Sequence, residues 1–407
     1  MIRFLLENPT YARYWIGRWF SDLGDWVRNM TLIFLVMNLS HGSSKAIAIN
    51  MFCEFVPMFL APLLGVFVDR WDRKRTFMWA TALRGLILVG IAWSLLYHVL
   101  YGIYLGSLIG SIATVFSQSA ESGLVMQMVA KDNRKMAASL KQIISSSMTL
   151  LGPPLGAGVF SLVGGRFALL ISLCLFALAA GFIASLPVDR FVRSDIDNNF
   201  TSIASDFRSG WQYSRSHPLV PSILTVGFAL GVSGGILNVL EVFIVTQFLH
   251  LPQNMLATIL SIQGFGMLVS VPIANRWKIK MESLLPVSVL IIGAGLGIMA
   301  AYPNFWVVIA GYLVFSFGNI AENIAMGTLL QTQVESVFQG RVISLLQTVS
   351  MGTMGFFMLI TGWIHVFVSV QVLVFTAGLV ALLSGIWVLL KGRVSKEVRK
   401  TDQVKTV

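Results

Sequence analysis

The sequence predicts an all-α membrane protein with 12 transmembrane helices in two parallel six-helix repeats. Three observations predict this fold: the composition, the recurrence of long apolar runs, and an internal repeat at about half the chain length. Of the 407 residues, 56% are hydrophobic and only 12% are charged, whereas soluble domains carry about 25% charged residues. The mean hydropathy of +0.78 agrees. Water is therefore excluded as the main solvent of this chain.

Long apolar runs recur along nearly the whole chain, separated by short polar breaks. A helix needs about 20 mainly apolar residues to cross a bilayer. Because these runs are apolar on all sides, they predict helices and not alternating strands. The first six predicted spans cover residues 13–38, 46–68, 76–97, 102–130, 137–163 and 166–187. The second six cover residues 218–249, 255–274, 283–301, 304–334, 340–365 and 367–391.

The distribution of basic residues predicts the orientation. With a cytoplasmic N-terminus, 23 of the 29 Lys and Arg residues fall in inside segments, and only Lys45 and Arg166 fall in outside loops. The positive-inside rule then places both termini in the cytoplasm. The net charge of +11 is thus explained by topology, and no nucleic-acid partner is expected.

The longest polar break divides the chain. We expect an N-terminal six-helix bundle over residues 1–187, a cytoplasmic linker over 188–217, a C-terminal bundle over 218–392 and a cytoplasmic tail over 393–407. Apolar residues at helical spacing predict an amphipathic surface helix in the linker. They are Phe200, Ile203, Phe207 and Trp211. A plain linker and a regulatory site remain alternatives there.

Three pairs of short segments repeat at offsets of about half the chain. The pairs are Gly65–Arg75 with Val271–Met281, Ala120–Glu121 with Ala321–Glu322, and Ser139–Gln142 with Ser344–Gln347. Their nearly constant offsets indicate a duplicated six-helix unit. An even number of spans in each unit makes the two copies parallel, an arrangement that places substrate near the membrane midplane and works by alternating access.

The segment Gly65–Arg75 resembles the signature loop of the major facilitator superfamily. In that loop a glycine is followed four residues later by Asp-Arg and then by a basic cluster. The resemblance implies a major facilitator fold and a cytoplasmic gating loop. The residues that match are Gly65, Asp69, Arg70, Arg73 and Lys74.

The run of Gly152, Pro153 and Gly156 is similar to the fifth-span motif of exporters in this superfamily, with an incomplete glycine pattern. The resemblance implies an antiporter. We expect the two glycines to share a face that packs closely against a helix of the other half, and Pro153 to favour a bend. An ordinary contact between small residues is the alternative.

Further segments resemble the branch that contains macrolide-efflux proteins, siderophore exporters and peptide-antibiotic exporters. They are Leu23–Asp25, His41–Ser43, Pro57, Arg84 and Gln339–Ser344.

Several charged residues lie inside predicted spans, where each costs roughly 2.5 to 3.5 kcal/mol. Asp25 and Arg28, three residues apart, can share one helix face. Other candidates are Glu54, Arg84, Glu121, Glu241 and Glu322. We hypothesise that they line the substrate cavity, and that Asp25, and secondarily Glu121 or Glu322, carries protons with Arg28 or Arg84 as countercharge. A structural ion pair is the alternative for each.

These features predict a secondary active transporter that exports a drug or secondary metabolite in exchange for protons, in a bacterial plasma membrane. Acidic residues favour a cationic or amphiphilic substrate, and a monomer is the default for two fused halves. We expect no enzymatic activity, no cofactor and no metal site, because the five histidines are scattered and no phosphate-binding loop occurs. An importer or facilitator, a lipid translocase and a non-transport membrane sensor remain alternatives.

Overall fold

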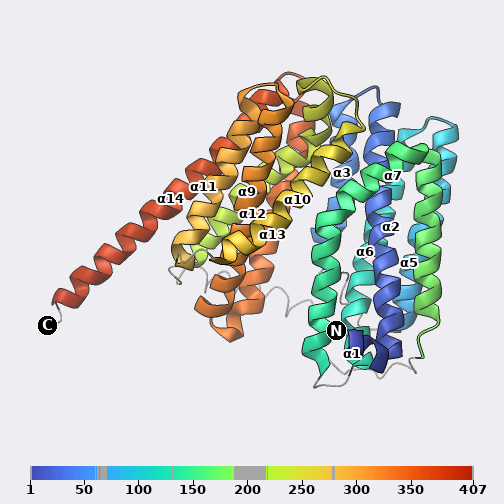
Figure 1. The fold of residues 1–407 in the computed structure, drawn as a ribbon, viewed down its shortest axis with the longest axis horizontal. Helices are drawn as coiled ribbons and strands as arrows, with labels where there is room; N and C mark the ends of the chain where they lie inside the picture. Colours follow the sequence, from blue (N-terminus) through green and yellow to red (C-terminus); the bar gives the residue numbers. More distant parts are fainter. Residues whose placement is uncertain are drawn as a thin grey trace. The chain divides into compact units, whose positions relative to one another are not determined.

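The computed structural model describes residues 2–59, 61, 64, 71–129, 133–187, 217, 219–276 and 280–405. Within this part the chain is helical and contains no strand, so the predicted fold class is confirmed. The chain forms two compact units. In the first, the helices are α1 (Ile2–Glu7), α2 (Pro9–Leu39), α3 (Ser44–Phe59), α5 (Arg73–Leu96), α6 (Leu100–Met128) and α7 (Arg134–Ala184) (Figure 1).

The second unit contains a π-helix, η2, that directly continues its first long helix. The elements from α9 onward are α9 (Val220–Phe243), η2 (Ile244–Phe248), α10 (Met255–Arg276), α11 (Met281–Ala301), α12 (Phe305–Gln333), α13 (Ser336–Ile364) and α14 (Val370–Lys405). Helix α14 extends past residue 391, where the last predicted span ends. Most of the predicted linker lies outside the described residues, so the domain boundaries stay predictions.

Among the described residues, nine helices are long and apolar enough to cross a membrane. Helix α7 counts once among them, although its 51 residues contain the fifth predicted span and nearly all of the sixth. The chain turns back at Gly164, whose φ of 76° is a backbone conformation that glycine adopts at little cost. Two predicted spans are not represented among the nine helices. The first corresponds to α2, which contains several charged residues, and the second corresponds to α3, of which 16 residues are described.

The same pairs of helices pack together in both units. In the first, α2 packs on α7, and α5 packs on α6 and α7. In the second, α9 packs on α13 and α14, and α11 packs on α12 and α14. If each helix is numbered by the spans that it contains, these pairs in the second unit are those of the first unit with six added to each span number. The predicted duplication is thus visible in which helices contact each other.

Glycines allow the closest of these approaches. A Cβ atom built on Gly231 of α9 would lie 2.5 Å from the main-chain oxygen of Ser350 in α13, and one on Gly235 would lie 2.5 Å from that of Met354. Both distances are shorter than real carbon contacts, so larger residues here would push α9 and α13 apart. Small residues let helix backbones approach in this way inside membranes.

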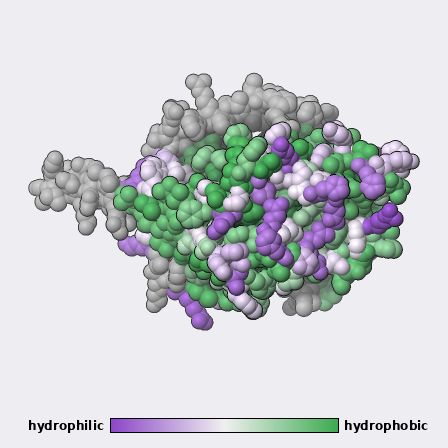
Figure 2. All heavy atoms as spheres, turned by 90° about the horizontal axis from the view of Figure 1, so that it is seen from above, coloured by the Kyte–Doolittle hydropathy of each residue, from purple (hydrophilic) through white to green (hydrophobic). Residues whose placement is uncertain are grey.

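Large apolar side chains cover the outer face of α5. Trp79, Leu86 and Trp93 follow one another at intervals of seven residues and are 66%, 66% and 64% exposed. Hydrophobic side chains also cover much of the surface seen in Figure 2, where hydrophilic ones gather mainly in the middle and on one side. An exposed apolar face of this length is expected where lipid replaces water.

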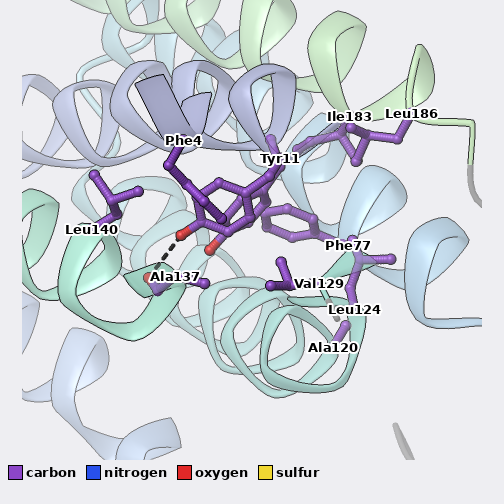
Figure 3. Close-up of a cluster of buried hydrophobic side chains, with 11 residues drawn as sticks. Phe4, Tyr11, Phe77, Ala120, Leu124, Val129, Ala137, Leu140, Ile183 and Leu186 are labelled. Atoms are coloured by element: carbon purple, nitrogen blue, oxygen red, sulfur yellow. Dashed lines mark hydrogen bonds between the residues drawn. The ribbon is translucent and has the colours of Figure 1, made fainter. Parts of the chain in front are cut away.

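One buried cluster joins five helices of the first unit. It contains Phe4 of α1, Tyr11 of α2, Phe77 of α5, Leu124 of α6 and Leu140 of α7 (Figure 3). The Tyr11 hydroxyl donates a hydrogen bond to the main-chain oxygen of Ala137 at 2.8 Å, so this buried polar group has a partner. The cluster fixes the end of α2 from which the charged residues of the candidate site extend.

Candidate functional site

Helix α2 carries a stripe of polar residues along one side. Tyr14, Arg18, Ser21, Asp25 and Arg28 follow one another at intervals of three or four residues, which places them on one helix face. Such a face could not contact lipid without a large penalty. The structure buries it against α5, α6 and α7.

The centre of the stripe is an ion-pair cluster, the Asp25 cluster, formed by Asp25, Arg28 and Arg84. One oxygen of Asp25 lies 2.5 Å from Nη1 of Arg84, and the other lies 3.1 Å from Nη1 of Arg28. Arg84 is 2% exposed and Asp25 is 18% exposed. A single carboxylate therefore faces two guanidinium groups and keeps limited access to its surroundings.

Arg84 is held by several groups besides Asp25. Its Nη2 donates hydrogen bonds to the hydroxyls of Ser21, Thr81 and Ser117 at 2.9, 3.1 and 3.3 Å. Its guanidinium carbon lies 5.0 Å from the centre of the Phe176 ring, a cation–π distance. Four helices thus fix the cation, whereas the carboxylate that it binds comes from α2 alone.

A second group of charges, the Glu121 cluster, lies nearer the start of α2. Glu121 of α6 is 1% exposed and accepts hydrogen bonds from Tyr14 and from Arg18, the latter at 2.6 Å. Lys141 of α7 lies 3.5 Å from the same carboxylate. Arg18 also pairs with Asp22 at 2.9 Å. Glu121 is therefore compensated by two cations.

Glu54 of α3 completes the charged residues in the membrane part of the first unit. Ser111 donates a hydrogen bond to its main-chain oxygen, while its Oε1 atom is buried without a hydrogen-bond partner among the described residues. The Glu54 carboxylate is within electrostatic reach of Arg28 and Asp25. Away from the ends of its spans, the unit thus holds four acids and four cations: Asp22, Asp25, Glu54 and Glu121 with Arg18, Arg28, Arg84 and Lys141.

Two acids inside spans of the second unit differ from those of the first. Neither Glu241 of α9 nor Glu322 of α12 forms an ion pair within the described ranges, and Glu322 is 6% exposed. Glu241 is within electrostatic reach of Tyr312, whose buried hydroxyl has no hydrogen-bond partner there. In the predicted repeat Glu322 corresponds to Glu121, but Leu346 stands where Lys141 stands in the first unit.

The signature loop is only partly described. Gly65, Asp69 and Arg70 lie outside the described residues, so their predicted gating role stays a prediction. Arg73 is the first residue of α5, and Lys74 donates a hydrogen bond to the main-chain oxygen of Leu186 at 2.5 Å. Lys74 thereby connects the start of α5 to the end of α7.

The exporter-type run has a different partner from the one expected. Gly152 and Gly156 of α7 pack against Trp26 of α2 in the same unit, and a Cβ atom on Gly156 would lie 2.5 Å from the Trp26 main-chain oxygen. The expectation that this face packs on a helix of the other half was wrong for these contacts. Pro153 lies within α7, beside the glycines.

Several partners were not assigned a role from the sequence. Arg18 and Lys141 carried a signal, because both are charged residues inside predicted spans. Ser21, Thr81 and Ser117 carried none, because serine and threonine are common in membrane helices. The pairing of Asp25 with Arg28 and Arg84 is present, whereas Glu121 pairs with other cations.

Comparisons with known proteins agree with this fold. The model of the Major Facilitator Superfamily matches residues 14–248, more than half of the chain. The uncharacterized MFS-type transporter YfiS of Bacillus subtilis is 24% identical over 339 residues, which cover 81% of this chain and 80% of YfiS. BacE of the same species, named as a candidate bacilysin exporter, is 25% identical over 368 residues, covering 86% and 88%.

Solved structures share the fold. A crystal structure of the nucleoside transporter NupG superposes with a TM-score of 0.76 at 13% identity, over 94% of this chain and 99% of NupG. A bacterial homologue of the iron transporter ferroportin, in an inward-facing state, gives a TM-score of 0.74 at 15% identity over 94% and 98%. At these identities the likeness concerns the fold alone.

Proposed function

Because the chain belongs to the Major Facilitator Superfamily, we propose that this transporter exports a small molecule in exchange for protons. The observation that carries the proposal is the Asp25 cluster, in which one buried carboxylate faces two guanidinium groups. A proton competes with Arg84 and Arg28 for the same two oxygens. Protonation of Asp25 therefore requires these ion pairs to loosen, and their re-formation expels the proton.

Such a competition couples protons to conformation. Arg84 of α5 is held by Ser117 of α6 and by the ring of Phe176 of α7. Its contacts with α2, to Asp25 and Ser21, loosen together when α2 shifts against its neighbours. Alternating access in this fold is a movement of helices around a central site. A proton bound in one state and released in the other supplies the driving force for export.

Two observations support export over import. The Gly152–Gly156 run resembles an exporter motif, and BacE, which is similar over most of its length, is named as a candidate exporter. The acids Glu241 and Glu322, which have no cation among the described residues, favour a cationic or amphiphilic substrate. The proposal places the protein as a monomer in a bacterial plasma membrane, with both termini in the cytoplasm.

The test compares wild type with Asp25→Asn in an efflux-deficient bacterium at matched membrane abundance. Accumulation of cationic dyes, macrolides and siderophores is measured with and without a proton uncoupler. We expect wild type to lower accumulation of at least one compound, and either the uncoupler or Asp25→Asn to abolish this effect. Glu282→Gln, which alters an exposed acid at the start of α11, should behave as wild type.

Two outcomes would contradict the proposal. Raised accumulation in cells with wild type indicates import. Export that persists unchanged in Asp25→Asn and in the presence of the uncoupler excludes Asp25 as the proton site. Purified protein in liposomes then gives a direct reading: substrate added on one side should change the internal pH for wild type but not for Asp25→Asn.

A further inference from the structure

An apolar groove of about 620 Å³ lies at the turn of α7. It is lined by residues on both sides of Gly164, among them Leu162 before the turn and Phe167, Leu170, Cys174 and Leu175 after it. Leu162 is 86% exposed and Phe167 is 64% exposed. In Figure 1 the two arms of α7, drawn in green, meet at this turn. The groove therefore opens to the surroundings of the first unit.

One charged residue directly precedes the lining residue Phe167 in the sequence. Arg166 is exposed, lies between the lining residues Val163 and Phe167, and forms no ion pair with a described residue. The turn after a membrane span is expected at the depth of the lipid headgroups. A guanidinium at that depth attracts phosphate oxygens, to which it can donate two parallel hydrogen bonds.

The length of the groove fits one lipid leaflet. From Arg166 to Leu175 the helix advances nine residues, or about 13 Å at 1.5 Å per residue. Half of a bilayer hydrocarbon core is about 15 Å. A cation at one end and an apolar channel of this length below it match the headgroup and the acyl chain of a phospholipid.

We propose that this groove is a binding site for an anionic phospholipid, with the phosphate on Arg166 and an acyl chain along α7. The site is distinct from the Asp25 and Glu121 clusters and requires neither proton coupling nor export. Trp26 packs against Gly152 and Leu35 contacts Gly165, so α2 packs against α7 on both sides of the turn at Gly164. A bound lipid would hold the turn of α7 against the helix that carries Asp25.

Cys174 provides a native probe for the test. The chain has two cysteines, and Cys174 is exposed within the groove. In a Cys53→Ser background, bimane attached to Cys174 is quenched by phospholipids with brominated chains in nanodiscs. We expect brominated phosphatidylglycerol to reach half-quenching at a mole fraction about fivefold lower than brominated phosphatidylcholine, the preference that one basic residue supplies.

Two variants of Arg166 distinguish specific lipid binding in the groove from non-specific contact with the surrounding lipid. Arg166→Gln should make the two lipids equal, while Arg166→Lys should keep part of the preference. Bimane on Leu86→Cys in a Cys53→Ser/Cys174→Ser background reports an equally apolar position of α5 outside the groove and should show no preference. Equal quenching by both lipids at Cys174, a preference that survives Arg166→Gln, or no quenching at all would overturn the proposal.

Discussion

At the residue scale, charged side chains whose insertion into a membrane costs free energy are paired with opposite charges. Asp25 faces Arg84 at 2.5 Å and Arg28 at 3.1 Å, and Glu121 faces Arg18 at 2.6 Å. Removing one partner of a buried ion pair leaves the other uncompensated, which costs about 3 to 5 kcal/mol. Removal of a single member of the Asp25 cluster is therefore expected to destabilise the first unit.

Arg84→Met should lower the thermal stability of the purified protein, because Asp25 loses its shortest ion pair and three hydroxyls lose a donor. We expect a loss of about 3 kcal/mol. The double variant Asp25→Asn/Arg84→Met should recover part of it, since the unpaired carboxylate is also gone. A double-mutant cycle of unfolding free energies in detergent measures this coupling, and additive effects would contradict a direct interaction.

At the element scale, helix pairs are set by where small residues fall. Where the first and fifth spans of the first unit meet, the glycines lie on α7 and contact α2, whereas at the equivalent contact of the second unit they lie on α9 and contact α13. The two pairs are equivalent in the repeat, so the same close approach is achieved from opposite sides. The first and fifth spans therefore pack closely in both units, although the glycines that allow this are on the fifth span in the first unit and on the first span in the second unit.

Gly156→Ala should destabilise the protein by about 1 to 3 kcal/mol, because the new methyl group meets the main chain of Trp26, which cannot move aside. Gly158→Ala is the matched control, because a Cβ atom there meets nothing within 4 Å. Alanine is the better helix former, so Gly158→Ala should be neutral or stabilising. Thermal unfolding of both variants checks this, and equal effects would argue against the α2–α7 contact.

At the scale of the whole molecule, two units with the same helix neighbours differ in charge. The first contains compensated acids, while Glu241 and Glu322 of the second have no cationic partner in the described ranges. The two units share helix pairings, but Leu346 of the second stands where Lys141 stands in the first. Under the proposed function, the paired acids of the first unit serve proton coupling, and Glu241 and Glu322 of the second attract the positive charge of a substrate.

The equivalent variants Glu121→Gln and Glu322→Gln should separate these roles. Glu121→Gln leaves Lys141 without its ion pair and weakens the attachment of Arg18, so we expect a loss of about 3 kcal/mol in stability. Glu322→Gln breaks no ion pair seen in the described residues and should leave stability nearly unchanged while weakening the binding of cationic substrates. Unfolding curves and substrate-induced stabilisation are measured for both variants. Equal behaviour of Glu121→Gln and Glu322→Gln in both measurements would contradict this prediction.

The sequence by itself determined the spans, the repeat and the residues on each helix face. Hydropathy and helical periodicity are local properties, because every membrane-spanning backbone must satisfy its own hydrogen bonds. The turn at Gly164 accordingly falls between the two spans predicted on either side of it. Asp25 and Arg28 were recognised as neighbours for the same reason.

Only the tertiary structure decided which faces meet. Tyr14 and Glu121 are separated by 107 residues, and Arg84 and Asp25 by 59, so no spacing rule relates them. The same holds for Gly152 and Gly156, whose small face was visible in the sequence but whose partner, Trp26, was not. A helix face can pack against several neighbours, and the choice depends on how well all the faces of the bundle fit together at once.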